Sequence, residues 1–357
     1  MKCIVHIGTE KTGTTSIQSF LYSNKDTLRA HGILITKSAG KRTHWGLAAA
    51  AYALNRRDDY TQKRGLQSDA ELSKHQARII ASLKDEVMNA KTAHTVIFSS
   101  EQIHSRLRSM GEIRNLKKIL TDIGFDDIQI ILYLREQAEL INSLHNTSVL
   151  YGRTEQPKGP NRNEHEQNIC DHKQSLQRYS DVFGKANVTP RLFCKDAFVD
   201  GSLIRDFMDA AGIDVPTESL SFPGRENQSV SAFGLELLRR LNNKVPRWLE
   251  DGTENRIRHE IIQSFQSAFN KGSKVSLGKD LIDAYRKAFA DSNEWVRKEY
   301  FPEREALFNF KTLHQAPAAS LNDDEMEQLV ALLGSIWAQP TKPHSSKRKR
   351  IRLPWRK

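Results

Sequence analysis

The stretch that decides the fold runs from residue 2 to residue 15 and reads KCIVHIGTEKTGTT. Its first six residues are mostly apolar and end at Gly8, which predicts a short buried strand. Gly8 and Gly13 enclose a loop of four residues, and apolar side chains at helical spacing begin at Ile17. This order is typical of a phosphate site, because glycines let backbone N–H groups turn inward and the helix N-terminus adds partial positive charge. The alternative is a purely structural loop at the start of a helix.

The position of the lysine in this loop indicates which kind of phosphate ligand the loop suits. The ATPase pattern G-x-x-x-x-G-K-[ST] requires a lysine directly after the second glycine. Here that position is Thr14, and the lysine lies earlier, at Lys11. A mononucleotide kinase or GTPase would lose the lysine that reaches the β- and γ-phosphates. The loop therefore favours one phosphate that bears a small reactive group over a triphosphate.

Further short apolar runs alternate with helical patterns. We expect strands at 33–36, 95–98, 128–134 and 188–193, and helices at 45–54, 76–90, 111–122 and 203–211. The polar residues 55–75 predict a stretch that includes a loop. Short apolar strands separated by helices predict an α/β three-layer sandwich with a central parallel sheet, as in P-loop NTPases.

The chain divides into three parts. Residues 1–230 predict the α/β core, and residues 231–340 predict a helical C-terminal extension because the strand signal fades there. Residues 341–357 form a basic tail that we expect to be disordered. From residue 342 to 357 the chain has eight lysines and arginines and no acid, which leaves +3 of the net charge of +11 for the rest. Such a tail suits an anionic membrane surface, or only keeps the protein in solution. No nucleic-acid partner is expected, because the body lacks a basic stripe.

The amino-acid composition also indicates the cellular compartment of the protein. No apolar run is long enough for a membrane helix, and the glycine-rich loop follows residues 1–7 too closely for a signal peptide. Cys3, Cys170 and Cys194 are odd in number and far apart, which favours a reducing compartment. We therefore expect a cytoplasmic protein, with the inner membrane face as the place where its tail would act.

Residues 8–15 resemble the 5'-phosphosulfate loop of sulfotransferases, whose core is Lys-[Ser/Thr]-Gly-Thr-[Thr/Ser]. That family also has a strand that ends in arginine, with a serine eight residues later. Here Arg135 closes the strand at 128–134, and Ser143 follows eight residues on. Arginine offers a planar fork to phosphate oxygens, and Ser143 lies about two turns into the next helix. The resemblance spans residues 1–230 and is to bacterial and glycan sulfotransferases.

The resemblance implies that 3'-phosphoadenosine 5'-phosphosulfate (PAPS) donates a sulfuryl group to an acceptor hydroxyl or amine by in-line displacement. Lys11 would neutralise the charge that grows on the bridging oxygen. The donor ligands implied are Gly8, Lys11, Thr12, Gly13, Thr14 and Thr15 for the 5'-phosphate, and Arg135 and Ser143 for the 3'-phosphate. The segment RENQS at 225–229 resembles a nucleotide-site segment and adds Asn227 and Ser229, although a helix N-cap is the competing interpretation. No metal is expected.

The general base is left open between two residues that follow strands. Glu101 comes after the strand at 95–98, and His44 after the strand at 33–36. His104 is a weaker third candidate. The structural alternatives are a first-turn carboxylate for Glu101 and a packing histidine beside Trp45 for His44.

The acceptor is inferred from one segment. Residues 153–170 are polar and contain Pro157, Gly159 and Pro160, which predicts a lid over a polar substrate. A carbohydrate or glycolipid acceptor fits such a lid. The alternatives for the whole chain are a P-loop phosphotransferase acting on a small metabolite and a non-catalytic module that binds adenosine bisphosphate.

Overall fold

The computed structural model describes residues 1–160, 164–222, 224, 230–251, 253–310 and 323–338. Within these residues lies a sheet of five parallel strands in the order β2-β3-β1-β4-β5. The strands are β1 (Lys2–His6), β2 (Ile33–Ile35), β3 (Thr95–Ser99), β4 (Asp127–Leu134) and β5 (Val188–Leu192). The predicted α/β class with a central parallel sheet is confirmed.

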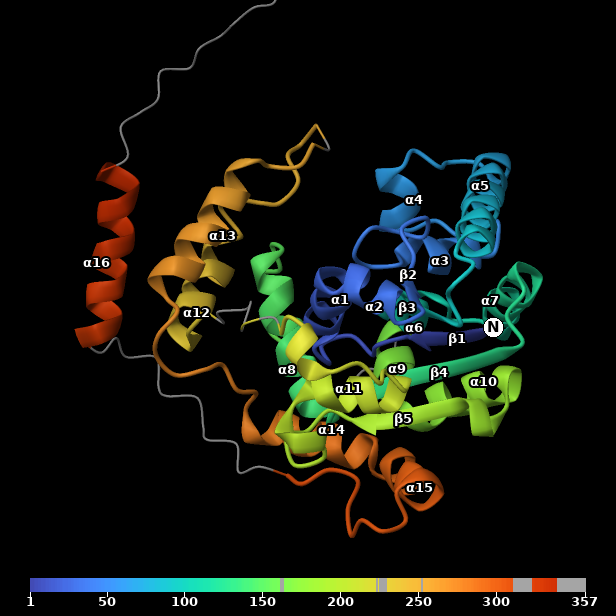
Figure 1. Cartoon of the computed structure of the whole chain (residues 1–357). Helices are drawn as coiled ribbons and strands as arrows, with labels where there is room; N and C mark the ends of the chain where they lie inside the picture. The colour runs from blue at the N-terminus through green and yellow to red at the C-terminus, as the bar shows by residue number, and fades with distance from the viewer. Residues whose placement is uncertain (161–163, 223, 225–229, 252, 311–322, 339–357) are drawn as a thin grey trace, which may run out of the picture.

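Helices cover both faces of the sheet (Figure 1). The helices of the core are α1 (Thr14–Ser23), α2 (Lys25–Ala30), α3 (Trp45–Ala50), α4 (Asp59–Lys63), α5 (Asp69–Asn89), α6 (Glu101–Arg106), α7 (Met110–Ile123), α8 (Gln137–Leu150), α9 (Glu164–Cys170), α10 (His172–Phe183) and α11 (Leu203–Ala211). Side chains alternate along β1, so that Cys3 and Val5 pack with α3, α5, α7 and α10, whereas Ile4 packs with α1, α2 and α11. The sheet is thus the middle layer of three.

The crossovers distinguish one end of this sheet, at the carboxyl ends of β1, β3 and β4. The helices that follow β1 pack on one face, whereas those that follow its two neighbours, β3 and β4, pack on the other face. In open parallel sheets, ligands bind at the carboxyl ends of strands where the connections diverge in this way. The loop after β1, the start of α6 after β3 and the residues after β4 all lie at that end.

The C-terminal third is helical, as expected, and contains α12 (Ala232–Leu241), α13 (Ile257–Ala268), α14 (Lys279–Ala288), α15 (Ala290–Tyr300) and α16 (Asp323–Ala338). α12, α13 and α16 share a small apolar cluster with the end of α8, and α16 stands beyond α13 in Figure 1. α14 instead packs on α8, and α15 packs on α10. Val296 and Phe308 even join the main core. Part of this extension is therefore built into the α/β body.

Residues 55–75 include loops, as predicted, but they also include helical segments that the sequence did not predict. They contain α4 and the first turns of α5, which begins at Asp69. Each helix starts with a capping box: Asp58 accepts from the backbone of Thr61, and Ser68 from that of Glu71. The polar residues there satisfy helix ends, which apolar periodicity does not detect.

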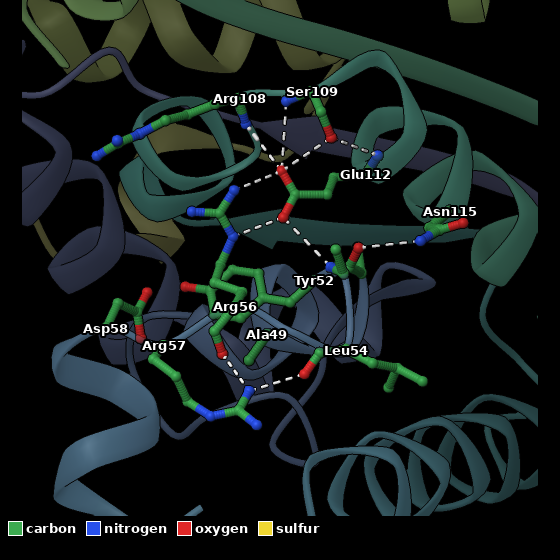
Figure 2. A network of polar contacts seen from close by, with 12 residues as sticks. Ala49, Tyr52, Leu54, Arg56, Arg57, Asp58, Arg108, Ser109, Glu112 and Asn115 are labelled. Atoms are coloured by element: carbon green, nitrogen blue, oxygen red, sulfur yellow. Dashed lines mark hydrogen bonds and ion pairs between the residues drawn. The ribbon is translucent and has the colours of Figure 1, made fainter. Parts of the chain in front are cut away.

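A buried carboxylate forms hydrogen bonds with two loops of the core, one at residues 53–56 and one at residues 108–109 (Figure 2). Glu112 in α7 is 1% exposed and accepts from Arg56 Nε at 2.5 Å and Arg56 Nη2 at 2.7 Å. It also accepts from the backbone N–H groups of Ala53, Arg108 and Ser109. Figure 2 shows the Arg108 side chain pointing away from Glu112. The network therefore fixes the backbone after α6, which carries Arg108.

Candidate functional site

The loop after β1 is anchored to the end of β4. The backbone N–H of Thr9 donates to the carbonyl of Tyr133 at 3.1 Å, and its hydroxyl donates to the same oxygen at 3.0 Å. Thr12 Oγ1 donates back to the carbonyl of Thr9 at 2.6 Å. Thr9 and Thr12 are both buried, so these bonds fix the loop directly beside the carboxyl end of β4.

Three residues of the loop have left-handed backbones: Gly8 with φ 95°, Lys11 with φ 62° and Gly13 with φ 72°. Such residues turn successive N–H groups towards one side and create an anion-binding concavity. Helix α1 begins directly after Gly13 and, among the described residues, has neither a side-chain cap nor an acid in its first turn. Thr14 is buried there and Thr15 is exposed. The N-terminal amides of α1 are thus open to an anionic ligand.

Lys11 points from the loop to helix α8. Its Nζ donates to Thr147 Oγ1 at 2.7 Å, and that hydroxyl donates to the carbonyl of Ser143 at 3.1 Å. Burial, and then the Arg135 guanidinium, lower the pKa of Lys11, while nearby carboxylates act in the opposite direction. The structure therefore brings Lys11 and the Ser143 turn of α8 together.

Arg135 follows β4 directly and contacts the loop. Its Nη1 donates to the carbonyl of Lys11 at 2.7 Å, and its Nη2 lies 3.4 Å from Glu139 Oε2. The guanidinium stands 5.3 Å from the centre of the Phe193 ring. Within the described part of the chain, the buried Nε of Arg135 has no hydrogen-bond partner. The Arg135 guanidinium thus retains one N–H donor, which could donate a hydrogen bond to a ligand oxygen.

Glu101, the first residue of α6, lies against the same loop. A Cβ at Gly8 would stand 3.0 Å from the Cβ of Glu101, so the glycine permits this close approach. Glu101 Oε2 accepts from Gln18 Nε2 at 2.8 Å, and Oε1 accepts from Gln102 Nε2 at 2.9 Å. Two neutral amides therefore hold the carboxylate of the partly exposed Glu101 beside the loop after β1.

The two candidate histidines lie in the interior. His44 is 1% exposed; its Nδ1 accepts from the backbone N–H of Ser99 at 2.8 Å, and its Nε2 donates to the carbonyl of Thr36 at 3.0 Å. Burial lowers the pKa of His44, so the ring is neutral near pH 7. Both of its ring nitrogens are engaged with the backbone. His104 is fully buried against Ser175, and burial lowers its pKa to about 3. A catalytic role for either histidine stays a prediction, and the geometry favours Glu101.

His165 is a site residue that the sequence reasoning missed. It belongs to α9, which packs on α6, where Asn168 Nδ2 donates to the carbonyl of His104 at 3.0 Å. Burial lowers the pKa of His165, while the charge of Glu10 in the loop raises it and that of Arg108 lowers it. In the described residues its buried Nδ1 has no partner. The signal for it was a histidine within the polar segment predicted as a lid.

Some expected features lie outside the described residues: Asn227, Ser229 and the basic tail at 341–357. In the part of the chain that is described, no group of three His, Cys, Asp or Glu side chains would hold a metal ion. Across that same part, no helix is both long enough and apolar enough to cross a bilayer.

Comparisons with known proteins add little to this picture. No family model matches the chain, and no solved structure matches it. An uncharacterized protein of Archaeoglobus fulgidus is 24% identical over 198 residues, which cover 52% of this chain and 50% of that protein. The chain therefore spans about half the length of the curated relative that it matches.

Proposed function

We propose that this chain is a PAPS-dependent sulfotransferase that moves a sulfuryl group to a hydroxyl or amine of an acceptor. The proposal depends above all on the contact between Arg135 Nη1 and the carbonyl of Lys11, 2.7 Å apart. A guanidinium fork directly beside the phosphate loop suits a donor that carries two separate phosphates. A triphosphate site would instead need a lysine after Gly13.

The residues fit such a donor. The N–H groups of residues 12–15, with the hydroxyls of Thr14 and Thr15, would bind its 5'-phosphate at the uncapped start of α1. Arg135, with its buried and unpartnered Nε among the described residues, and Ser143 would bind the 3'-phosphate. Asn227 and Ser229 stay part of the proposal as further ligands. When bound, the donor supplies the sulfuryl group and the bisphosphate leaving group.

Each side chain at this end of the sheet would then have its own role in the reaction. The acceptor oxygen attacks sulfur, the bond from sulfur to the phosphate oxygen breaks, and the acceptor proton passes to Glu101. Lys11 stabilises the charge that remains on the departing oxygen. Gln18 and Gln102 hold the Glu101 carboxylate in place. We favour Glu101 over His44 because its carboxylate is partly exposed beside the loop.

Calorimetry and a transfer assay test this function. We expect adenosine 3',5'-bisphosphate to bind tightly and ATP not to bind, and we expect PAPS-dependent transfer to one member of a panel of glycans, glycolipids and phenols. Tight binding of ATP without the bisphosphate would favour a phosphotransferase and refute the proposal. Binding of the bisphosphate without any transfer would favour a non-catalytic module.

The acceptor and the location are further parts of the proposal. A carbohydrate or glycolipid acceptor suits the polar segment at 153–170, from which α9 brings His165 to the site. We also propose that the enzyme works in the cytoplasm, with the tail at 341–357 on the inner membrane face. Deletion of that tail should abolish sedimentation with vesicles that contain anionic lipid. Unchanged sedimentation would refute the membrane role and leave the transfer reaction unaffected.

A further inference from the structure

A cleft of about 560 Å³ opens at the C-terminal end of α8, beside the segment that joins α12 to α13. Its lining includes Tyr151, Arg247, Glu254, Arg256, Arg258 and His259. Arg247 Nε pairs with Glu254 Oε1 at 2.9 Å, and Arg256 and Arg258 give the lining its excess positive charge. The cleft lies outside every motif that the sequence assigned to the donor.

One of these charges is buried. Arg258 is 4% exposed; its Nη1 donates to Asn242 Oδ1 and to the carbonyl of Val245, both at 2.8 Å. Its Nη2 donates to the carbonyl of Leu150 at 3.0 Å. These partners are neutral: within the described part of the chain they are an amide oxygen and two backbone carbonyls, with no carboxylate among them. Burial, and then Arg247, lower its pKa, which is the behaviour of a cation without a counter-charge. An anionic ligand group would supply that charge.

Aromatic faces flank a second arginine of the lining, Arg247. Tyr151 also lines the cleft, whereas Trp248 is not part of the lining. The Arg247 guanidinium lies 5.3 Å from the ring centre of Tyr151 and 5.1 Å from that of Trp248. Tyr151 is 60% exposed and Trp248 is 49% exposed. Gly152 allows the close approach, because a Cβ there would stand 3.1 Å from the Cβ of Arg247. Exposed flat rings beside cations suit a ligand with both apolar C–H faces and acidic groups, which describes an acidic sugar.

Tyr151, which lines the cleft, lies one helical turn beyond the residue that Lys11 contacts. Lys11 Nζ contacts Thr147 Oγ1, and the backbone N–H of Tyr151 donates to the carbonyl of Thr147 at 3.1 Å. Tyr151 lies four residues beyond Thr147, which is about 6 Å along the helix axis. The cleft therefore lies close enough to Lys11 for one chain-like ligand to reach both places.

We propose that this cleft binds an acidic oligosaccharide and holds it as the acceptor. The assignment as acceptor rests on the proposed sulfotransferase function, whereas the binding itself does not. The recognition would come from Arg247 and Arg256 on the acidic groups, with the Tyr151 ring packed on a sugar face. Arg258 fixes the end of α8 and adds charge at the base of the cleft.

Binding of tetragalacturonate, which carries a carboxylate on every sugar, tests the proposal in 0.15 M NaCl, with neutral maltotetraose as the uncharged comparison. The full-length chain should bind tetragalacturonate more tightly than maltotetraose. The double variant R247Q/R256Q should weaken tetragalacturonate binding about 10-fold or more, because it removes two charge-assisted contacts. The double variant R205Q/R240Q removes two exposed arginines elsewhere and should leave binding unchanged. All these proteins keep the basic tail, so the tail cannot account for a difference between them.

Titration of adenosine 3',5'-bisphosphate into the same variants separates this proposal from the function above. The bisphosphate should bind all of them equally, since neither pair of arginines lies at the donor site. Equal tetragalacturonate binding by the cleft variant and the parent protein, or an equal loss in R205Q/R240Q, would overturn the cleft proposal. Loss of the bisphosphate signal in the parent protein would instead remove the sulfotransferase function and leave the cleft as a binding site for acidic sugars.

Discussion

The guanidinium of Arg135 donates a hydrogen bond to the backbone carbonyl of Lys11, with 2.7 Å between Nη1 and oxygen. Lys11 has a φ of 62°, a conformation that costs energy for any residue with a Cβ. Arg135 therefore helps to hold the strained residue of the phosphate loop in addition to offering its own fork. The two proposed phosphate subsites are mechanically linked through this one bond.

Replacement of Arg135 should discriminate between nucleotides. We expect Arg135→Gln to weaken adenosine 3',5'-bisphosphate binding about 10- to 100-fold, because it removes a charge-assisted hydrogen bond to the 3'-phosphate. Binding of AMP, which lacks that phosphate, should fall much less. Calorimetric titrations of both ligands measure the difference. Arg135→Lys keeps the charge without the fork and should give an intermediate loss, whereas Arg205→Gln, at an exposed pair, should change nothing. Equal losses for the two nucleotides would place the 3'-phosphate elsewhere.

Replacement of Lys11 should separate binding from turnover. We expect Lys11→Ala to lower kcat about 100-fold or more, since the charge on the departing oxygen loses its stabilising group. Lys11→Gly should lose turnover equally, yet be more stable than Lys11→Ala by about 1 kcal/mol, because glycine accepts a positive φ. PAPS-dependent rates and urea denaturation measure the two effects. The exposed Lys118→Ala is the control. Turnover that survives intact in Lys11→Ala would contradict the proposed mechanism.

The fixed shape of the loop predicts an effect at Gly13. A Cβ there would stand 2.3 Å from Leu203 Cδ2, and the residue has a φ of 72°. We expect Gly13→Ala to lower the free energy of unfolding by about 1–3 kcal/mol and to weaken bisphosphate binding. Leu203→Ala in the same chain should relieve only the steric part of the strain. Gly111→Ala, where a Cβ meets nothing closer than 3.8 Å, should be neutral or stabilising. A Gly13→Ala protein with normal stability and binding would show that the loop tolerates other conformations.

The sequence predicted the sheet because each strand is a short apolar run flanked by polar residues, as in Ile128–Leu134. β5 contains Pro190 and lies at an edge of the sheet, where a missing N–H is tolerated. The start of α5 was missed because its first turns are polar. Its signal was present as Ser68 and Glu71, whose spacing is that of a capping box.

The candidate base was not decided by sequence, because the distinction depends on contacts between distant segments. His44 is engaged by the backbone of Thr36 and by that of Ser99, which is 55 residues away. Glu101 is held by Gln18, which is 83 residues away. The relation of His165 to Glu10 is equally long-range. Only the fold shows which titratable group forms hydrogen bonds with the backbone and which lies beside the loop after β1.

The proposed base is tested by comparing Glu101→Gln with His165→Gln. We expect Glu101→Gln to lower kcat about 100-fold or more, because the acceptor proton loses its destination. Glu101→Asp keeps a carboxylate and should retain part of the activity. His165→Gln should change kcat little, since His165 is assigned no proton transfer. The pH dependence of kcat in each variant is the measurement. A larger loss in His165→Gln, with loss of the acidic limb of the pH profile, would transfer the role of base to His165.

The network around Glu112 predicts a pH-dependent stability that is independent of catalysis. Burial raises the pKa of Glu112, but its bonds to Arg56 and to backbone N–H groups outweigh burial and lower the pKa below its ordinary value of 4.5. Its contribution is therefore fully present above about pH 4.5 and is lost as the pH falls through the lowered value. Glu112→Gln should cost about 3 kcal/mol at pH 7, since it leaves Arg56 without its counter-charge. In urea denaturation, the gap between Glu112→Gln and the parent protein should narrow as the pH falls from 5 to 3, whereas Asp122→Asn, at an exposed pair, should leave the midpoint unchanged. A difference in stability that stays constant over this pH range would show that the carboxylate charge of Glu112 does not stabilise the loops that contain Arg56 and Arg108.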